Sequence, residues 1–224
     1  RIFKRKNQVR DINACVSLLI DMSGSMSCGK IRVAMQSAYA MAMTLTQLKV
    51  PFEVYGFVTE NSDIKMQRAY ESFIKDSSPA FKSRVVNTAC PERIYAFKSF
   101  DENFDITSKK GMAGTGSGGI YLIQNEDSKH LKLALERLSA RREKVKALFV
   151  FSDGSPAYDA HDGGRASQGQ LKFYGAKAKE KYGVDVYGIG INSNSVAQFY
   201  TNHKVVNNIA ELPKALFEYL RKIF

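Results

Sequence analysis

Four short runs of almost uninterrupted apolar residues constrain this 224-residue chain more than any other feature. Strands that helices cover on both faces give continuous apolar runs, whereas half-exposed strands alternate apolar and polar residues. The segments between the runs repeat apolar residues every three or four positions, as amphipathic helices do. This alternation predicts an α/β fold with a doubly wound, mostly parallel sheet and helices on both faces. The predicted buried strands are residues 14–20, 52–59, 147–151 and 184–191.

Weaker patterns complete the predicted order of elements. The run 93–100 is predicted as an edge strand and 204–206 as a short last strand. Residues 60–91 are polar and are predicted to form a long insertion or irregular excursion. The glycine-rich residues 111–119 form a low-complexity patch before a helix that begins near Ser128. The apolar positions of the predicted helices are Ile31, Met35, Ala38, Ala42, Leu45 and Leu48; Leu131, Leu135 and Leu138; Leu171, Tyr174, Ala178 and Tyr182; and Leu212, Leu216, Tyr219 and Ile223.

Composition limits the class of protein. With 44% hydrophobic residues we expect one domain over residues 1–224. The sequence does not begin with methionine, so we expect it to be part of a longer protein. No apolar run approaches the roughly 18 residues of a membrane span, and a secretory signal is not evident, so we expect a cytoplasmic protein without a membrane partner. The three cysteines have no metal-ligand spacing. The net charge of +11 favours an acidic partner, but the basic residues do not alternate with aromatics, which disfavours nucleic acid.

A carboxylate and two hydroxyls follow the first predicted strand. Asp21, Ser23 and Ser25 lie in the segment Asp21-Met22-Ser23-Gly24-Ser25-Met26, and Asp153 follows the strand 147–151. In a doubly wound sheet the carboxyl ends of parallel strands share one rim, so Asp21 and Asp153 are expected to meet there. Oxygen ligands suit a hard divalent cation such as Mg²⁺ or Mn²⁺. The alternative is that Ser23 and Ser25 cap the helix that follows.

The spacing Asp-x-Ser-x-Ser, paired with the distant Ser152-Asp153-Gly154 after another strand, resembles the von Willebrand factor A domain, a Rossmann-like fold, and its metal-ion-dependent adhesion site. The resemblance implies that Asp21, Ser23 and Ser25 bind Mg²⁺ (or Mn²⁺), with Asp153 acting through water. It also implies that an Asp or Glu of a partner protein fills the remaining position on the ion.

The third ligand loop departs from the usual pattern of that family. Most members place a threonine just before the helix after the glycine-rich loop, whereas this chain has Asn125-Glu126-Asp127-Ser128 there. We expect Asp127 to be the third-loop ligand, with Thr115 and then Ser128 as alternatives. An additional carboxylate neutralises more of the charge on the ion, so a partner's acid should bind less tightly. Asp127 could instead be the N-cap of the helix.

A wider set of segments narrows the resemblance. They are residues 1–6, 16–26, 54–59, 125–127, 152–156 and 187–191. Together they are most similar to the C-terminal domain of the T subunit of aerobic cobaltochelatase, which implies that residues 1–224 are the C-terminal part of a longer protein. The acidic third loop and the Gly-x-Pro that follows Asp153 point to this subgroup.

This resemblance implies docking rather than catalysis. The T subunit works with a ring-forming AAA+ ATPase and a large chelatase subunit to insert Co²⁺ into a corrin-ring precursor. We therefore expect a non-catalytic, metal-dependent interaction domain that binds an acidic residue of the AAA+ ATPase in a cobaltochelatase-like complex of cobalamin biosynthesis. The alternatives are an adaptor of an AAA+ remodelling machine unrelated to cobalamin and a metal-dependent hydrolase that uses Asp21 and Asp153.

Other motifs are weaker indications of function. Asp159, His161 and Asp162 follow Asp153 closely and could form a second site or be ordinary loop residues. The glycine-rich patch lacks the Lys-Ser/Thr ending of a P-loop, so nucleotide binding is not expected there. Cys15 is predicted to be a core residue and Cys28 to be exposed, while the methionines Met35, Met41 and Met43 are predicted to fill the core.

Overall fold

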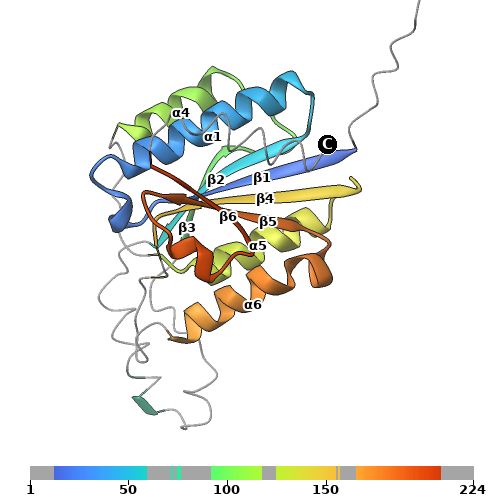
Figure 1. Ribbon diagram of the computed structural model, residues 1–224. Coiled ribbons are helices and arrows are strands. Elements are labelled where there is room, and N and C mark those ends of the chain that lie inside the picture. Colours follow the sequence, from blue (N-terminus) through green and yellow to red (C-terminus); the bar gives the residue numbers. More distant parts are fainter. Residues whose placement is uncertain are drawn as a thin grey trace, which may run out of the picture.

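The strands form one mixed sheet in the order β3-β2-β1-β4-β5-β6 (Figure 1). The computed structural model describes residues 13–59, 72, 75–76, 92–117, 125–154, 156 and 165–207. Neighbouring strands pair in parallel except β3, which pairs antiparallel with β2. The strands are β1 (Ala14–Asp21), β2 (Phe52–Thr59), β3 (Glu92–Lys98), β4 (Val145–Ser152), β5 (Asp185–Ile191) and β6 (Asn202–Val206).

The sequence predictions for the sheet are confirmed. The four continuous apolar runs are the central strands β1, β2, β4 and β5, and all eight residues of β1 are buried. The two weaker runs are the outer strands, β3 at one edge and β6 at the other. An outer strand has only one neighbour and is less fully covered, so it needs fewer apolar residues. The fold class is therefore the predicted doubly wound, mostly parallel α/β sheet.

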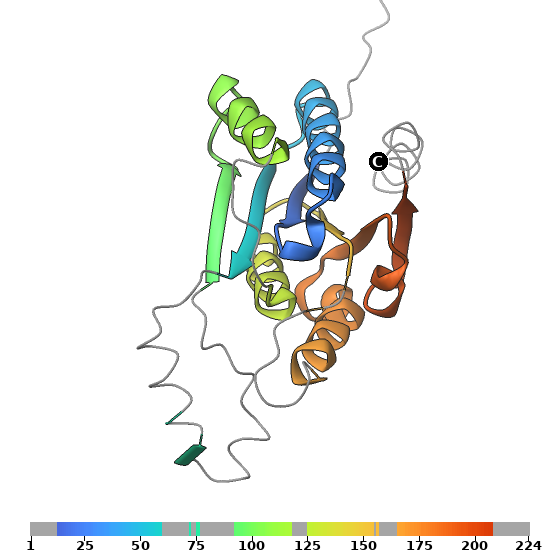
Figure 2. The same cartoon turned by 90° about the vertical axis from the view of Figure 1, so that its left-hand side faces the viewer.

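Helices cover both faces of the sheet (Figures 1 and 2). On one face α1 (Lys30–Gln47) packs with α4 (Ile106–Gly116), and on the other α5 (Asp127–Ser139) packs with α6 (Arg165–Tyr182). Two hydrophobic clusters fill the layers, one between α1 and the sheet and one between the sheet and the pair α5 and α6. Cys15 is buried and Cys28 is exposed, as predicted. None of the described helices is both long and apolar enough to cross a membrane.

The glycine-rich patch requires a correction. Residues 106–116 form the helix α4, although the sequence pattern did not predict a helix there. Asp105 begins the helix because its side chain accepts hydrogen bonds from the backbone N–H groups of Thr107 and Ser108. Packing of α4 against α1, with Met112 buried between them and the sheet, outweighs the low helix propensity of glycine.

Several expectations fall outside the described residues. These are the basic segment 1–6, nearly all of the excursion 60–91, the helix predicted from Leu212 to Ile223, and the second candidate site at Asp159, His161 and Asp162.

Two glycines of α6 provide a matched test of how closely this helix must pack. A Cβ atom added at Gly175 would lie 2.2 Å from the carbonyl oxygen of Phe199, whereas one added at Gly169 would meet nothing within 4 Å. We expect Gly175→Ala to lower the free energy of unfolding by about 1–3 kcal/mol, because a backbone atom must move. Gly169→Ala should raise it by about 0.5–1 kcal/mol, because alanine favours the helix. Urea unfolding followed by circular dichroism measures both, and equal effects of the two substitutions would contradict the close packing.

Candidate metal centre

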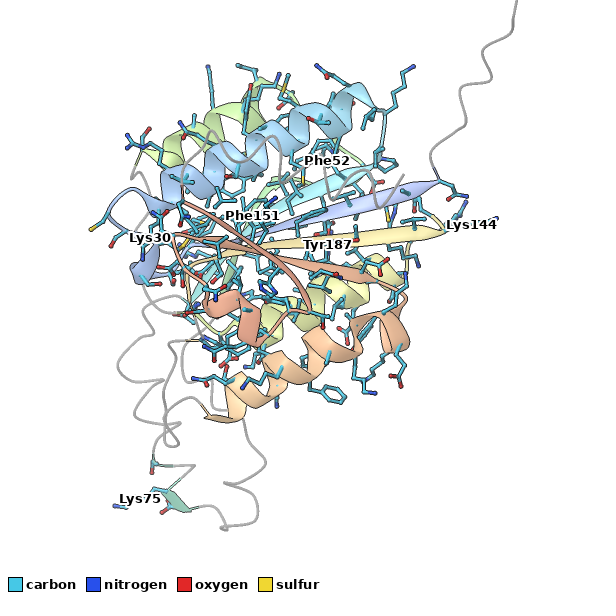
Figure 3. All side chains as sticks on the ribbon, in the orientation of Figure 1. Lys30, Phe52, Lys75, Lys144, Phe151 and Tyr187 are labelled. Atoms are coloured by element: carbon cyan, nitrogen blue, oxygen red, sulfur yellow. The ribbon has the colours of Figure 1, made fainter. Side chains whose placement is uncertain are left out.

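The order of the strands reverses between β1 and β4, and the candidate ligands gather at the carboxyl ends of these two strands. Asp21 is the last residue of β1, and Asp153 follows directly after β4. The parallel register pairs Ile20 with Phe151, which places Ser152 beside Asp21. Figure 3 shows Lys30 at this rim and Lys144 at the opposite end of the sheet. Asp21 and Asp153 thus share the crevice where doubly wound sheets bind ligands.

The first loop is anchored by its methionines, and its predicted ligands lie at the rim, Asp21 and Ser23 buried and Ser25 exposed. Met22 and Met26 are fully buried, and the Met22 N–H donates to the Phe57 carbonyl oxygen at 2.9 Å. Between them, the Ser23 N–H donates to Asp21 Oδ1 at 2.8 Å, and the hydroxyls of Ser23 and Ser25 lie 3.0 Å apart. The capping position of α1 is Gly29, without a side-chain hydrogen bond. The serines therefore do not cap this helix, and their hydroxyls are available to the rim.

A chain of hydrogen bonds ties three loops together. Ser25 Oγ donates to Asp153 Oδ1 at 2.6 Å, which joins the first loop to the loop after β4. Ser152 Oγ donates to Asp21 Oδ2 at 2.7 Å and makes a second connection between them. The side-chain amide of Asn125 approaches Asp21 Oδ2 at 3.3 Å and donates to Asp127 Oδ2 at 2.6 Å. All five predicted ligand residues thus lie within one hydrogen-bonded group.

The two alternatives for the third loop lie elsewhere. Thr115 Oγ1 donates to the Gly111 carbonyl oxygen within α4, and Ser128 Oγ donates to Glu126 Oε1. Asp127 is the first residue of α5, and Glu126 occupies the capping position. The Asp127 carboxylate accepts a hydrogen bond from the side-chain amide of Asn125. Within the described part of the chain, Asp127 is the candidate of the third loop that a hydrogen bond, through Asn125, joins to the group around Asp21.

Ser152 and Asn125 were not predicted to have a role in the site, although both flank predicted ligands. Glu126 was also missed. Its carboxylate is fully buried, and its Oε1 accepts hydrogen bonds from Ser128 at 2.6 Å and from Ser167 at 2.5 Å. Because Ser167 belongs to the first turn of α6, this contact fixes the start of α5, and with it Asp127, against α6.

The electrostatics of the site favour a cation. Burial raises the pKa of Asp21 to about 6, although hydrogen bonds from Ser152 and Ser23 oppose the shift. Burial, and then the charge of Asp21, raise the pKa of Asp127 well above its usual range. The same two carboxylates add to the effect of burial in raising the pKa of Tyr200. Lys30 supplies one positive charge at the rim, with Nζ 2.5 Å from Asp153 Oδ2 and 3.2 Å from the Ser25 carbonyl oxygen.

The donor atoms fit a hard divalent cation. Asp21 supplies a buried carboxylate, and Ser23 and Ser25 supply hydroxyl oxygens beside it. Across the described ranges, no three His, Cys, Asp or Glu side chains are grouped as metal ligands. A cation here would therefore need the serine hydroxyls and water in addition to carboxylates. That donor set suits Mg²⁺ or Mn²⁺, whereas zinc prefers nitrogen and sulfur ligands.

Comparisons with known proteins agree with this architecture. A family model described as "Cobalamin biosynthesis protein CobT VWA domain" matches residues 2–224. Among solved structures, the pilus adhesin SpaC from Lactobacillus rhamnosus GG in its open conformation is similar, with a TM-score of 0.60 and 12% identity over 94% of this chain and 30% of that chain. The PilB minor pilin from Streptococcus sanguinis has a TM-score of 0.57 and 14% identity over 95% of this chain and 61% of that one.

A von Willebrand factor type A protein from Catenulispora acidiphila has a TM-score of 0.51 and 14% identity, over 94% of this chain and 42% of that chain. The chain therefore spans less than two thirds of each of these three structures. At such low identities the similarity shows the fold alone, which is that of a von Willebrand factor type A domain.

The buried carboxylate of Asp21 predicts how the stability of the metal-free protein depends on pH. Its pKa is raised on folding, from the usual 3.8 to about 6. Below pH 4 the protonated Asp21 side chain makes its full contribution to the free energy of unfolding. As the pH rises through 6 this contribution is lost, and the free energy of unfolding falls by up to about 3 kcal/mol. Buried His130 has the opposite effect on the pH dependence of stability, because folding lowers its pKa from 6.5 to about 4. Its contribution to stability therefore increases as the pH rises.

A comparison of wild type with Asp21→Asn separates the effect of Asp21 on the pH dependence of stability from that of His130, because His130 is unchanged in the variant. In EDTA, the stability of Asp21→Asn relative to wild type should increase between pH 4 and pH 7. Urea unfolding at several pH values measures this difference, and the exposed Asp101→Asn is the control. A difference that stays constant with pH would show that burial does not disfavour the ionised form of Asp21.

Proposed function

The chain belongs to the family of the cobalamin biosynthesis protein CobT VWA domain, and from this premise we propose that it is a metal-dependent docking domain. In this proposal Mg²⁺ or Mn²⁺ is bound by Asp21, Ser23, Ser25 and Asp127, with Asp153 acting through water. The partner is the AAA+ ATPase subunit of a cobaltochelatase-like complex, which can also include a large chelatase subunit. The domain itself is a non-catalytic subunit of that complex.

The observation that supports this proposal most is the hydrogen-bonded connection between three loops at the reversal of strand order. Ser25 contacts Asp153, and Asp21 contacts both Ser152 and Asn125. Such contacts hold oxygen atoms from distant parts of the sequence in place before a cation binds. Little reorganisation is then needed, which favours binding.

The residues have different roles in the proposed site. The hydroxyl of Ser23 is buried, whereas Ser25 is exposed and lies at the surface where a partner would approach. Asp21 is fully buried, and its Oδ1 accepts the Ser23 N–H at 2.8 Å. When bound, the cation supplies a position that accepts a carboxylate oxygen from outside the domain. The residues of this chain orient that position and exclude water from its inner side.

The overall charge supports an acidic partner. At +11 the chain attracts an approaching acidic surface, which increases the rate of association. Asp127 limits the strength of the contact between the cation and the partner's carboxylate. Its own carboxylate neutralises part of the charge on the ion, whereas a neutral hydroxyl ligand would not. The proposed contact is therefore specific for a carboxylate but moderate in affinity.

Metal-dependent docking can be tested by recovery of the AAA+ subunit on the immobilised domain. We expect recovery in Mg²⁺ and its loss in EDTA, because the cation forms the bridge between the two proteins. Ser25→Ala should reduce recovery in Mg²⁺, since it removes one ligand at the surface and leaves the buried Asp21 intact. The control is Ser139→Ala at the C-terminal end of α5, far from the rim, where the side chain is half-buried. Equal recovery in Mg²⁺ and EDTA would refute the proposal.

Lys30 allows a second test that does not require the partner. Its ammonium contacts Asp153 Oδ2 and the Ser25 carbonyl oxygen, so it competes with a divalent cation for the same negative charge. We expect Lys30→Met to tighten Mg²⁺ binding by about three- to tenfold, which corresponds to roughly 1 kcal/mol of removed repulsion between positive charges. Titration calorimetry measures the affinity. Lys132→Met, on the exposed pair with Glu136, should leave it unchanged. Weaker binding after Lys30→Met would contradict this competition.

A further inference from the structure

A cleft lies between α1 and α4, and its lining begins at Arg32, near the start of the helix that follows the first ligand loop. Figure 2 shows the two helices side by side over one face of the sheet. The cleft has a volume of about 510 Å³, and Met35 and Met112 line its buried side. Tyr39 and Ile106 stand at one end with 37% and 63% of their surface exposed. Exposed apolar side chains around a hollow of this size are typical of a site that binds another apolar group.

The charges around the cleft have one sign. Neither α1 nor α4 contains an acidic residue, and Arg32, Lys109 and Lys110 line the cleft. The nearby Asp105 uses its carboxylate to cap α4. On the other face of the sheet, in contrast, α5 and α6 mix acids and bases and contain ion pairs such as Lys132 with Glu136. Among the described residues that line the cleft, none is acidic, so none of them balances the charge of its basic side chains.

The cleft begins close to the metal loop. An added Cβ atom at Gly29, the capping residue of α1, would lie 3.9 Å from a guanidinium nitrogen of Arg32. From Arg32 to Tyr39 the cleft follows two turns of α1, which is about 10 Å. At the end near Arg32, an added Cβ atom at Gly116 would lie 3.4 Å from Met35 Cβ, so α4 approaches α1 closely there. A segment bound in the cleft would thus run along α1 and α4 from the end where α1 follows the first ligand loop.

We propose that this cleft binds an amphipathic helix of a partner protein that combines apolar residues with acidic ones. The apolar face of the helix packs on the exposed Tyr39 and Ile106, above the buried Met35 and Met112. Its acidic residues contact Arg32, Lys109 and Lys110. This is the known mode in which a helix lies in a hydrophobic groove with charged flanks. The inference deepens the proposed function, because one partner can reach both surfaces, but binding in the cleft itself requires no metal.

Other occupants fit the charges less well. A second copy of this chain carries the same net charge of +11. Residues 1–12 are strongly basic, and residues 118–124 carry no charge, so neither segment balances the basic side chains of the cleft. A nucleic acid would balance them but would place phosphates against a largely apolar surface. An acidic amphipathic helix satisfies both features of the cleft together.

The test uses a fluorescein-labelled 16-residue peptide with leucine at positions i, i+3, i+4 and i+7 and glutamate at the flanking positions. We expect saturable binding in fluorescence anisotropy, equal in Mg²⁺ and in EDTA. The double substitution Lys109→Glu with Lys110→Glu should weaken binding by at least about tenfold, because attraction becomes repulsion. Lys172→Glu with Lys177→Glu changes the net charge equally on the exposed face of α6 and should have a much smaller effect. Circular dichroism confirms that each variant is folded.

The outcomes separate this inference from the proposed function. Equal weakening by both double substitutions, or equal binding of a peptide with lysine in place of glutamate, would overturn the cleft as a specific site. Displacement of the peptide by a short single-stranded DNA at equal concentration would also overturn it, in favour of nucleic acid. Binding that disappears in EDTA would assign the peptide to the metal centre instead. If peptide binding in the cleft persists while the AAA+ subunit is recovered equally in Mg²⁺ and EDTA, the proposed docking fails and the cleft remains.

Discussion

The burial of the Asp21 carboxylate at the end of β1 constrains the rest of the candidate site. A carboxylate without exposed surface loses its hydration, and burial raises its pKa to about 6 for this reason. Hydrogen bonds from Ser23, Ser152 and Asn125 partly offset this loss. These donors belong to three separate segments, so the segments are held relative to β1 and β4. The sheet therefore positions the ligand oxygens, and a cation can use an arrangement that the fold already maintains.

The location of the site could be predicted because it follows from topology. Strands covered on both faces must be apolar throughout, which identified β1, β2, β4 and β5 without reference to any other protein. Once strands and helices alternate, the carboxyl ends of the parallel strands share one rim. Asp21 and Asp153 then had to lie together, although 132 positions in the sequence separate the end of β1 from Asp153. Asp127 was placed in the site by resemblance, and the structure brings it there through its contact with Asn125.

Other features could not be predicted because they depend on side-chain geometry between distant segments. Ser152 and Asn125 reach Asp21 across 131 and 104 positions of the sequence, and no local pattern marks either residue as its partner. Glu126 is a fully buried carboxylate, although acidic residues usually lie at the surface, and it is stabilised by hydroxyls from α5 and α6. The helix α4 contains three glycines, and its cap at Asp105 together with its packing on α1 decides its conformation. In each case tertiary contacts outweigh the local preference of the sequence.

The two proposed surfaces complement each other energetically. A metal centre with an acidic third loop binds a partner's carboxylate only moderately, and a short cleft between two helices also binds moderately. When one partner contacts both, the second contact forms at a high effective concentration, so the combined affinity can exceed either alone by orders of magnitude. In the proposed docking, the basic side chains of α1 and α4 attract the partner before contact, and a bound cation then selects a carboxylate at a defined position. Loss of either contact returns the complex to moderate affinity, which makes docking reversible.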